Sequence, residues 1–164
     1  MKLSIPFHRQ DTDYSCGAAS LQMLLHHVHG TYPSEEHLMH RMHVSKEEGT
    51  HHDELVRVLR EENLHVYVDN ESSLQVIEHL IKAEFPVLVH FIEPTANEGH
   101  YAVVVGFSDS RIYLNDPWSG SGFSMSRDDF YSRWHNENHK YKRWLLVASP
   151  EIAFPSYHHP PKSS

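Results

Sequence analysis

The pattern of apolar residues changes at Pro86, and this change constrains the fold more than any other feature of the sequence. Before it, apolar residues recur three and four apart and predict helices from about 16 to 30, 34 to 42, 53 to 62 and 73 to 81, with an alternating strand at 65–68. After it, β-branched and aromatic runs predict strands at 86–92, 99–107, 111–116 and 142–148, with a short helix at 126–134. Residues 3–7 predict an edge strand or extended lead-in, and 117–122 predict a loop. The expected N-terminal caps of the helices after the first are Ser34, Thr50 in the capping arrangement 50–53, Ser72 or Ser73, and Ser126.

This order of elements indicates one domain of the α+β class. A chain of 164 residues is too short to divide, so an N-terminal helical layer should pack on a C-terminal antiparallel β-sheet. We expect the domain to span 1–153. The segment 154–164 is rich in Pro, His and Ser and is expected to be a disordered tail.

The two strands on either side of Ser108–Ser110 should form an antiparallel hairpin. His100 and Asp116 are equally far from position 108, so they would lie nearly opposite each other, with about 5 Å between Cβ atoms. That spacing predicts a hydrogen-bonded imidazole and carboxylate. Asn115 could compete for the imidazole, but neighbouring strand residues point to opposite faces, and the count favours Asp116.

Cys16 is the only cysteine and lies where a polar loop becomes a helix. Free N–H groups and the helix dipole favour an anion in the first turn, which makes Cys16 a candidate nucleophile. The Gln10 amide and the Cys16 backbone N–H are candidate donors to an oxyanion. A lone cysteine is more often a buried apolar residue, so the hypothesis depends on His100 and Asp116.

Composition argues against several classes of protein. The chain has 14 Lys and Arg against 22 Asp and Glu, a net charge of −8, and no basic patch, so we expect no nucleic-acid binding. No stretch of about 20 apolar residues predicts membrane insertion, and we expect a cytoplasmic location. The 17 histidines include His37 and His40, three apart, but no zinc-protease pattern. We predict no metal and no cofactor, with a histidine-rich metal-binding protein as one alternative.

Three motifs then occur in order: Gln10-x5-Cys16-Gly-Ala-Ala-Ser-Leu-x-Met23, Gly99-His-Tyr-Ala-Val-Val-Val-Gly106 and Asn115-Asp-Pro117. Together they resemble the bacteriocin-processing cysteine peptidases that cut after a double-glycine leader, a papain-like family. The resemblance covers roughly residues 5 to 150. It implies a papain-like fold with Cys16 as nucleophile, His100 as general base and acid, Asp116 orienting the imidazole, and Gln10 in the oxyanion hole.

We therefore expect a free-standing cysteine peptidase that hydrolyses a peptide or protein substrate through a thioester, with a Gly-Gly site as a candidate cleavage site. Five residues are candidates for contact with the substrate: Tyr14, Gly17, Gly99, Tyr101 and Trp118. The three aromatic side chains would narrow the cleft, and Gly17 would let the substrate backbone pass close to the sulfur. The alternatives are an acyltransferase or isopeptidase on the same triad and a non-catalytic peptide-binding module. The oligomeric state is left open.

Overall fold

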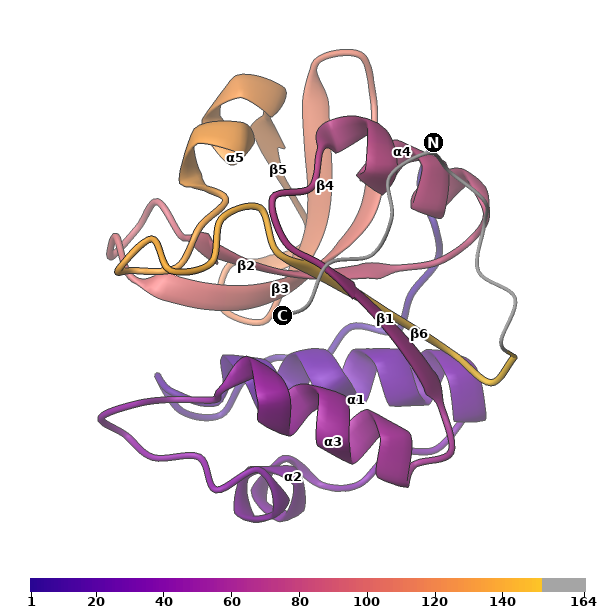
Figure 1. Ribbon diagram of the computed structural model, residues 1–164, viewed down its shortest axis with the longest axis vertical. Coiled ribbons are helices and arrows are strands. Elements are labelled where there is room, and N and C mark those ends of the chain that lie inside the picture. Colours follow the sequence, from indigo (N-terminus) through magenta and orange to yellow (C-terminus); the bar gives the residue numbers. More distant parts are fainter. Residues whose placement is uncertain (152–164) are drawn as a thin grey trace.

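The computed structural model describes residues 1–151 and is built around one antiparallel sheet (Figure 1). Its strands are β1 (His65–Asp69), β2 (Val87–Ile92), β3 (Gly99–Phe107), β4 (Arg111–Asp116), β5 (Gly120–Ser126) and β6 (Leu145–Ser149). They lie in the order β1-β6-β2-β3-β4-β5. The helices are α1 (Cys16–His29), α2 (Glu35–Arg41), α3 (His52–Glu61), α4 (Leu74–Lys82) and α5 (Arg127–Arg133). The expected tail at 154–164 and the last two residues of the expected domain lie outside the described residues.

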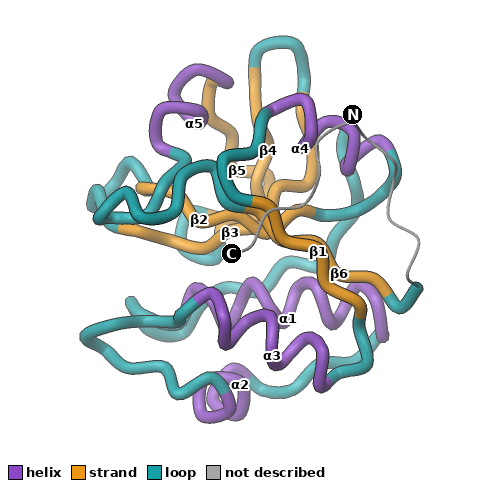
Figure 2. Tube along the Cα trace, in the orientation of Figure 1, coloured by secondary structure: helices purple, strands orange, loops and turns teal. Residues whose placement is uncertain are grey.

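The sheet is covered on both faces, as Figures 1 and 2 show. Helices α1, α2 and α3 lie on one side, where alternate strand residues such as Leu88, Val103 and Leu146 join the core of α1 and α3. Helices α4 and α5 cover the other side, where the intervening residues, such as Val89 and Val104, form a second core. The α+β class is confirmed. The expectation of a single helical layer was incomplete, because both faces of these strands are apolar.

The serine caps expected from the sequence are present. Ser34, Ser73 and Ser126 each accept a hydrogen bond from a backbone N–H three residues later, at 3.1, 3.2 and 3.1 Å. Helix α1 ends at Gly30, whose φ of 75° is the left-handed conformation that glycine adopts readily. Local sequence signals therefore fix where α2, α4 and α5 begin and where α1 ends.

Two expectations about elements were wrong. The expected cap of α3 at Thr50 is not formed: His51 occupies the N-cap position, and Thr50 packs against Gly17 instead. The segment expected to be a loop at 117–122 contains the start of β5, an edge strand whose one partner among the described strands is β4. The lead-in at 3–7 is extended and outside the named strands, although the Leu3 N–H donates to the Val105 carbonyl at 2.7 Å.

No helix within residues 1–151 is both long enough and apolar enough to cross a bilayer.

Candidate active site

Cys16 is the first residue of α1, as the sequence predicts, and its side chain is half-buried. The sulfur accepts a hydrogen bond from the backbone N–H of Tyr101 at 3.4 Å, so β3 contacts the helix at the thiol. The first turn of α1 contains no acidic residue. The positive end of the helix and the Tyr101 N–H both favour negative charge on the sulfur.

His100 and Asp116 are hydrogen-bonded, with 2.7 Å between Nε2 and Oδ1. They are not directly opposite each other, because Val103 pairs with Asn115 and this register, extended by one residue, places Asp116 beside Ala102. The turn is centred later than position 108. In addition, the register of the two strands shifts between Val104 and Gly106. The pair therefore meets along a diagonal, which long side chains can span.

The carboxylate of Asp116 is fully buried and held by the loop that follows it. Its Oδ1 also accepts from the backbone N–H groups of Trp118, at 2.8 Å, and Ser119, at 3.1 Å. Asn115 lies on the other face, where its Nδ2 donates to the Ile5 carbonyl at 3.0 Å. The structure thus brings Asp116 to the imidazole and gives Asn115 a place in the packing of the lead-in.

The charge state of His100 depends on both neighbours. Burial acts to lower its pKa, but the negative charge of Cys16 and the hydrogen bonds with Asp116 and with Cys16 outweigh it and raise the pKa of His100 to about 10. Since Nε2 is occupied by Asp116, Nδ1 is the nitrogen available to exchange a proton with the sulfur. This arrangement can hold a thiolate and an imidazolium side by side.

Gln10 lies beside the same site, on the loop that precedes α1. Its backbone N–H donates to the Pro117 carbonyl at 3.1 Å, which ties this loop to the one after Asp116. Its Nε2 donates to the Thr12 carbonyl at 2.7 Å. An amide nitrogen carries two N–H groups, so one is left for another acceptor.

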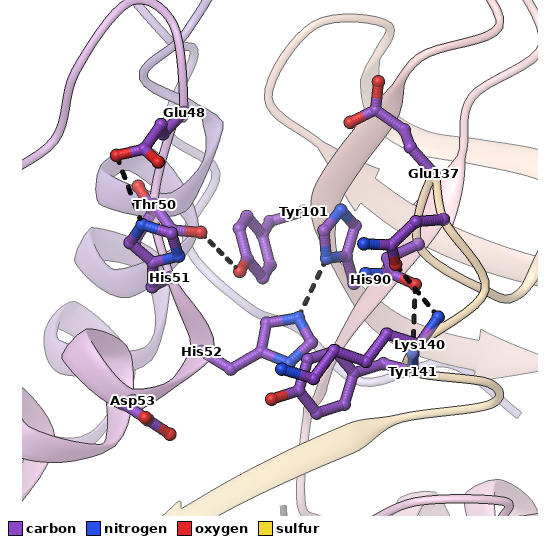
Figure 3. Close-up of a pocket in the computed structure, with 12 residues that line it drawn as sticks. Glu48, Thr50, His51, His52, Asp53, His90, Tyr101, Glu137, Lys140 and Tyr141 are labelled. Atoms are coloured by element: carbon purple, nitrogen blue, oxygen red, sulfur yellow. Dashed lines mark hydrogen bonds and ion pairs between the residues drawn. The ribbon is translucent and has the colours of Figure 1, made fainter.

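The cleft consists of three neighbouring cavities. Cys16, Tyr14 and Tyr101 line one of about 240 Å³, and His100, Gln10 and Trp118 line a second of about 320 Å³. These two cavities share Asp13, Glu98 and Gly99. The third and larger cavity, of about 490 Å³, adjoins the first and is drawn in Figure 3.

Four of the five expected substrate contacts line this cleft: Tyr14, Gly99, Tyr101 and Trp118. Gly17 does not. A Cβ on Gly17 would lie 2.7 Å from Thr50 Oγ1, so the missing side chain makes room for Thr50 and not for a substrate. The expectation for Gly17 was wrong because a loop far away in the sequence fills that space.

Sequence reasoning missed Glu35. This buried side chain at the start of α2 accepts from the backbone N–H of Asp11 with both oxygens, at 3.1 and 3.2 Å. It thereby fastens the loop that leads to Cys16, and burial raises the pKa of its carboxyl. An acidic residue just after a serine cap is ordinary in a helix, so nothing in the sequence distinguished it. No sequence pattern predicts the hydrogen bond from the Tyr101 backbone N–H to the Cys16 sulfur either.

The histidine pair of the metal-binding alternative does not form part of a larger set. His37 and His40 are both exposed on α2. Within residues 1–151, no group of three or more His, Cys, Asp or Glu side chains is placed to hold a metal ion.

Comparison with known proteins gives consistent results. The sequence profile of the peptidase C39 family matches residues 4–138. A search of curated proteins finds no significant match. Among solved structures, the peptidase domain of Streptococcus ComA, a bifunctional ABC transporter of a quorum-sensing pathway, is similar with a TM-score of 0.72 and 20% identity, covering 88% of this chain and 98% of that one.

Two further structures are similar. A double-glycine motif protease from an AMS/PCAT transporter, solved in complex with the leader peptide, has a TM-score of 0.68 and 21% identity, over 92% of this chain and 94% of that one. A C39-like peptidase from Bacillus anthracis has a TM-score of 0.70 and 16% identity, over 90% and 97%. These likenesses show a shared papain-like fold.

Proposed function

Because this chain belongs to the peptidase C39 family and is a cysteine peptidase, we propose that it cleaves peptide bonds with Cys16 as nucleophile, His100 as general base and acid, and Asp116 as the orienting group. The observation that supports the proposal most directly is the 2.7 Å hydrogen bond between His100 and Asp116. Cys16 lies beside this pair, and its negative charge raises the pKa of His100. Sulfur, imidazole and carboxylate lie in the order that nucleophilic catalysis requires.

The reaction proceeds in two steps. His100 takes the thiol proton on Nδ1, and the Cys16 sulfur attacks the scissile carbonyl carbon to give a tetrahedral oxyanion. The Cys16 backbone N–H and the second N–H of Gln10 donate to that oxyanion. His100 then protonates the leaving amine and a thioester remains. Water, deprotonated by His100, attacks the thioester, which releases the acid and restores the thiol.

The substrate in this proposal is a peptide or protein with small residues at the cut. Tyr14 and Tyr101 line the cavity around the sulfur, the smallest of the three, and leave little room for bulky side chains. A Gly-Gly site meets that requirement, and a similar solved structure is a double-glycine motif protease. The mechanism needs a reduced Cys16, which fits the cytoplasmic location expected from the sequence.

A peptide-library cleavage profile tests the proposal. We expect the wild type to cleave a subset of peptides and Cys16→Ala to cleave none while keeping the same far-UV circular dichroism spectrum. Mass spectrometry of quenched reactions should show the protein joined to the N-terminal fragment of the substrate. Cleavage by Cys16→Ala would refute the proposal. Transfer of the fragment to an added amine in preference to water would assign acyl transfer instead of hydrolysis.

A further inference from the structure

The largest cavity of the cleft adjoins the thiol, yet the proposed mechanism does not use it. It shares Thr50, His90 and Tyr101 with the cavity that contains Cys16 (Figure 3). Tyr101 also contacts the sulfur through its backbone N–H. Because an extended peptide advances about 3.3 Å per residue, a substrate whose scissile bond lies at Cys16 brings a side chain into this cavity within a few residues.

The wall of this cavity contains a pair of neutral histidines. His52 Nε2 and His90 Nδ1 are hydrogen-bonded at 2.9 Å. The His52 ring is stacked on Trp144, with 3.9 Å between ring centroids. Burial, followed by the positive charges of nearby groups, lowers the pKa of His52 to about 2 and that of His90 to about 3. Neither imidazole carries a charge at physiological pH, so each has one N–H and one bare nitrogen.

The hydrogen bond between the rings uses one nitrogen of each histidine, His52 Nε2 and His90 Nδ1. One ring donates and the other accepts, so His52 Nδ1 and His90 Nε2 are left to bond with other groups.

His52 Nδ1 is unused. His52 is only 6% exposed, and its Nδ1 has no hydrogen-bond partner among the described residues. A buried polar nitrogen without a partner is costly, so the site favours a ligand or a rearranged side chain that can form a hydrogen bond with it.

Carboxylates surround the opening of the cleft, and among the described residues their one ion-pair contact is that of Glu48 Oε2 with His51 Nε2, at 3.7 Å. Six exposed acidic residues line this cavity and the one around Cys16: Asp13, Glu47, Glu48, Asp53, Glu98 and Glu137. Within the described residues, none of them forms an ion pair with a lysine or arginine, whereas carboxylates far from the cleft, such as Glu61 and Glu78, do. The lysines and arginines that line the same two cavities are just two, Lys46 and Lys140.

Aromatic rings complete the wall. Tyr101 is fixed by its hydroxyl, which donates to the Thr50 carbonyl at 2.7 Å, and Tyr141 lies next to His52 with 4.3 Å between ring centroids. The methylene groups of a lysine or arginine pack well on such rings, and the charged end is attracted to their faces. An acidic side chain would face several carboxylates, and an apolar one would leave them without a counter-charge.

We propose that this cavity receives a lysine or arginine side chain of the substrate, close to the scissile bond, and that the enzyme is therefore selective for basic peptides. The proposal rests on the peptidase function proposed above and adds the class of substrate. Glu48 and Glu137, which line both cavities, supply the counter-charge.

The test is a series of fluorogenic peptides in which each position near the cut carries lysine, arginine, norleucine or glutamate in turn. At one position, kcat/KM should be about tenfold or more higher for lysine than for norleucine, which has a similar length without the charge, and lowest for glutamate. The lysine preference should shrink as salt is added, because the carboxylates are exposed.

Variants identify the residues responsible. Glu48→Gln and Glu137→Gln should each reduce the ratio of kcat/KM for the lysine and norleucine peptides, and Glu137→Lys should shift the preference toward the glutamate peptide. Glu36→Gln, on an exposed face of α2, is the matched control and should leave the ratio unchanged. Thermal unfolding of each variant checks that it is folded.

The outcomes separate the two proposals. Cleavage that requires Cys16 but shows no preference for lysine or arginine at any position would overturn the role of this cavity and leave the peptidase function intact. A lysine preference that survives in both Glu48→Gln and Glu137→Gln would also overturn it. Failure of the wild type to cleave any peptide would count against both proposals.

Discussion

The charge on Asp116 is the single-residue property on which the chemistry of the site most depends. Its Oδ1 accepts from His100 and from two backbone N–H groups of the following loop, and its Oδ2 has no partner within residues 1–151. The carboxylate therefore cannot turn away from the imidazole without leaving buried donors unpaired. Together with Cys16 it raises the pKa of His100 to about 10, against the effect of burial.

The raised pKa of His100 predicts the alkaline side of the pH profile. The folded-state pKa lies above the ordinary value of 6.5, so the imidazolium is retained through neutral pH and lost as pH rises through about 10. We expect kcat/KM to fall on an alkaline limb near pH 10. Asp116→Asn keeps the shape of the side chain but removes its charge. This variant should lower kcat/KM, and it should also shift the pKa of the alkaline limb down by about 1–3 units.

The control for this prediction is Asp128→Asn, since Asp128 is exposed on α5. Its pH profile should match that of the wild type. An alkaline limb that stays in place in Asp116→Asn would show that Asp116 does not hold the imidazolium.

The candidate site could be predicted only in part from single residues. Chemistry and spacing select Cys16, His100 and Asp116, and the structure brings His100 to Asp116 with the thiol beside them. His100 and Asp116 were expected to lie nearly opposite each other, but the register places them on a diagonal, because backbone geometry and not residue counting sets the turn position and the register. The buried Glu35 carries no local signal at all.

At the scale of elements, the loop that leads to α1 is held from two directions. Glu35 of α2 accepts from the Asp11 N–H, and the segment after β4 accepts from Arg9 and Gln10 through the carbonyls of Trp118 and Pro117. These contacts fix the backbone between Gln10 and Cys16. The proposed oxyanion donors therefore depend on α2, although α2 contributes nothing to the chemistry.

Removing the contact from α2 should loosen the site. Glu35→Ala leaves the Asp11 N–H without its acceptor, and we expect the free energy of unfolding to fall by about 1–3 kcal/mol. Catalysis should fall as well, because Gln10 and Cys16 lie on the same loop. Urea unfolding and kcat/KM measure the two effects. Glu36→Ala, one residue later and exposed, should change the free energy of unfolding by no more than about 0.5 kcal/mol; an equal effect of both variants would contradict this role.

Most elements were predictable because their signals are local. Helical periodicity and serine caps place four of the helices well, and apolar runs place the buried strands. Strand β5 was missed because its residues, rich in Gly and Ser, lack apolar alternation and lie at the edge of the sheet. The cap of α3 was misplaced because packing against Gly17 takes Thr50 away from the helix.

At the scale of the whole molecule, α1, α2 and α3 form a layer on one face of the sheet (Figure 1). Both layers contribute to the cleft, since Cys16 of α1 and Tyr101 of β3 line the same cavity. Tyr101 of β3 joins the two sides twice: its N–H donates to Cys16, and its hydroxyl donates to the Thr50 carbonyl at 2.7 Å. How these layers sit on each other is a tertiary property. The sequence predicted both layers but not the residue that links them.

Tyr101→Phe tests this link. The variant keeps the ring and the backbone contact to the sulfur but leaves the buried Thr50 carbonyl without its donor. We expect the free energy of unfolding to fall by about 1–2 kcal/mol and kcat/KM to fall with it. Tyr131→Phe is the control, since that side chain is 46% exposed on α5. Unfolding curves that coincide for Tyr101→Phe and the wild type would contradict the proposed link.

The central claim is that His100 activates Cys16, and the chain offers a direct measurement of it. Since Cys16 is the only cysteine, the rate of alkylation by iodoacetamide reports on that thiol alone. At pH 6 we predict that the wild type and His65→Ala, a control at an exposed histidine of β1, react roughly tenfold or more faster than His100→Ala. Equal rates in the wild type and His100→Ala, with both proteins folded, would contradict the account.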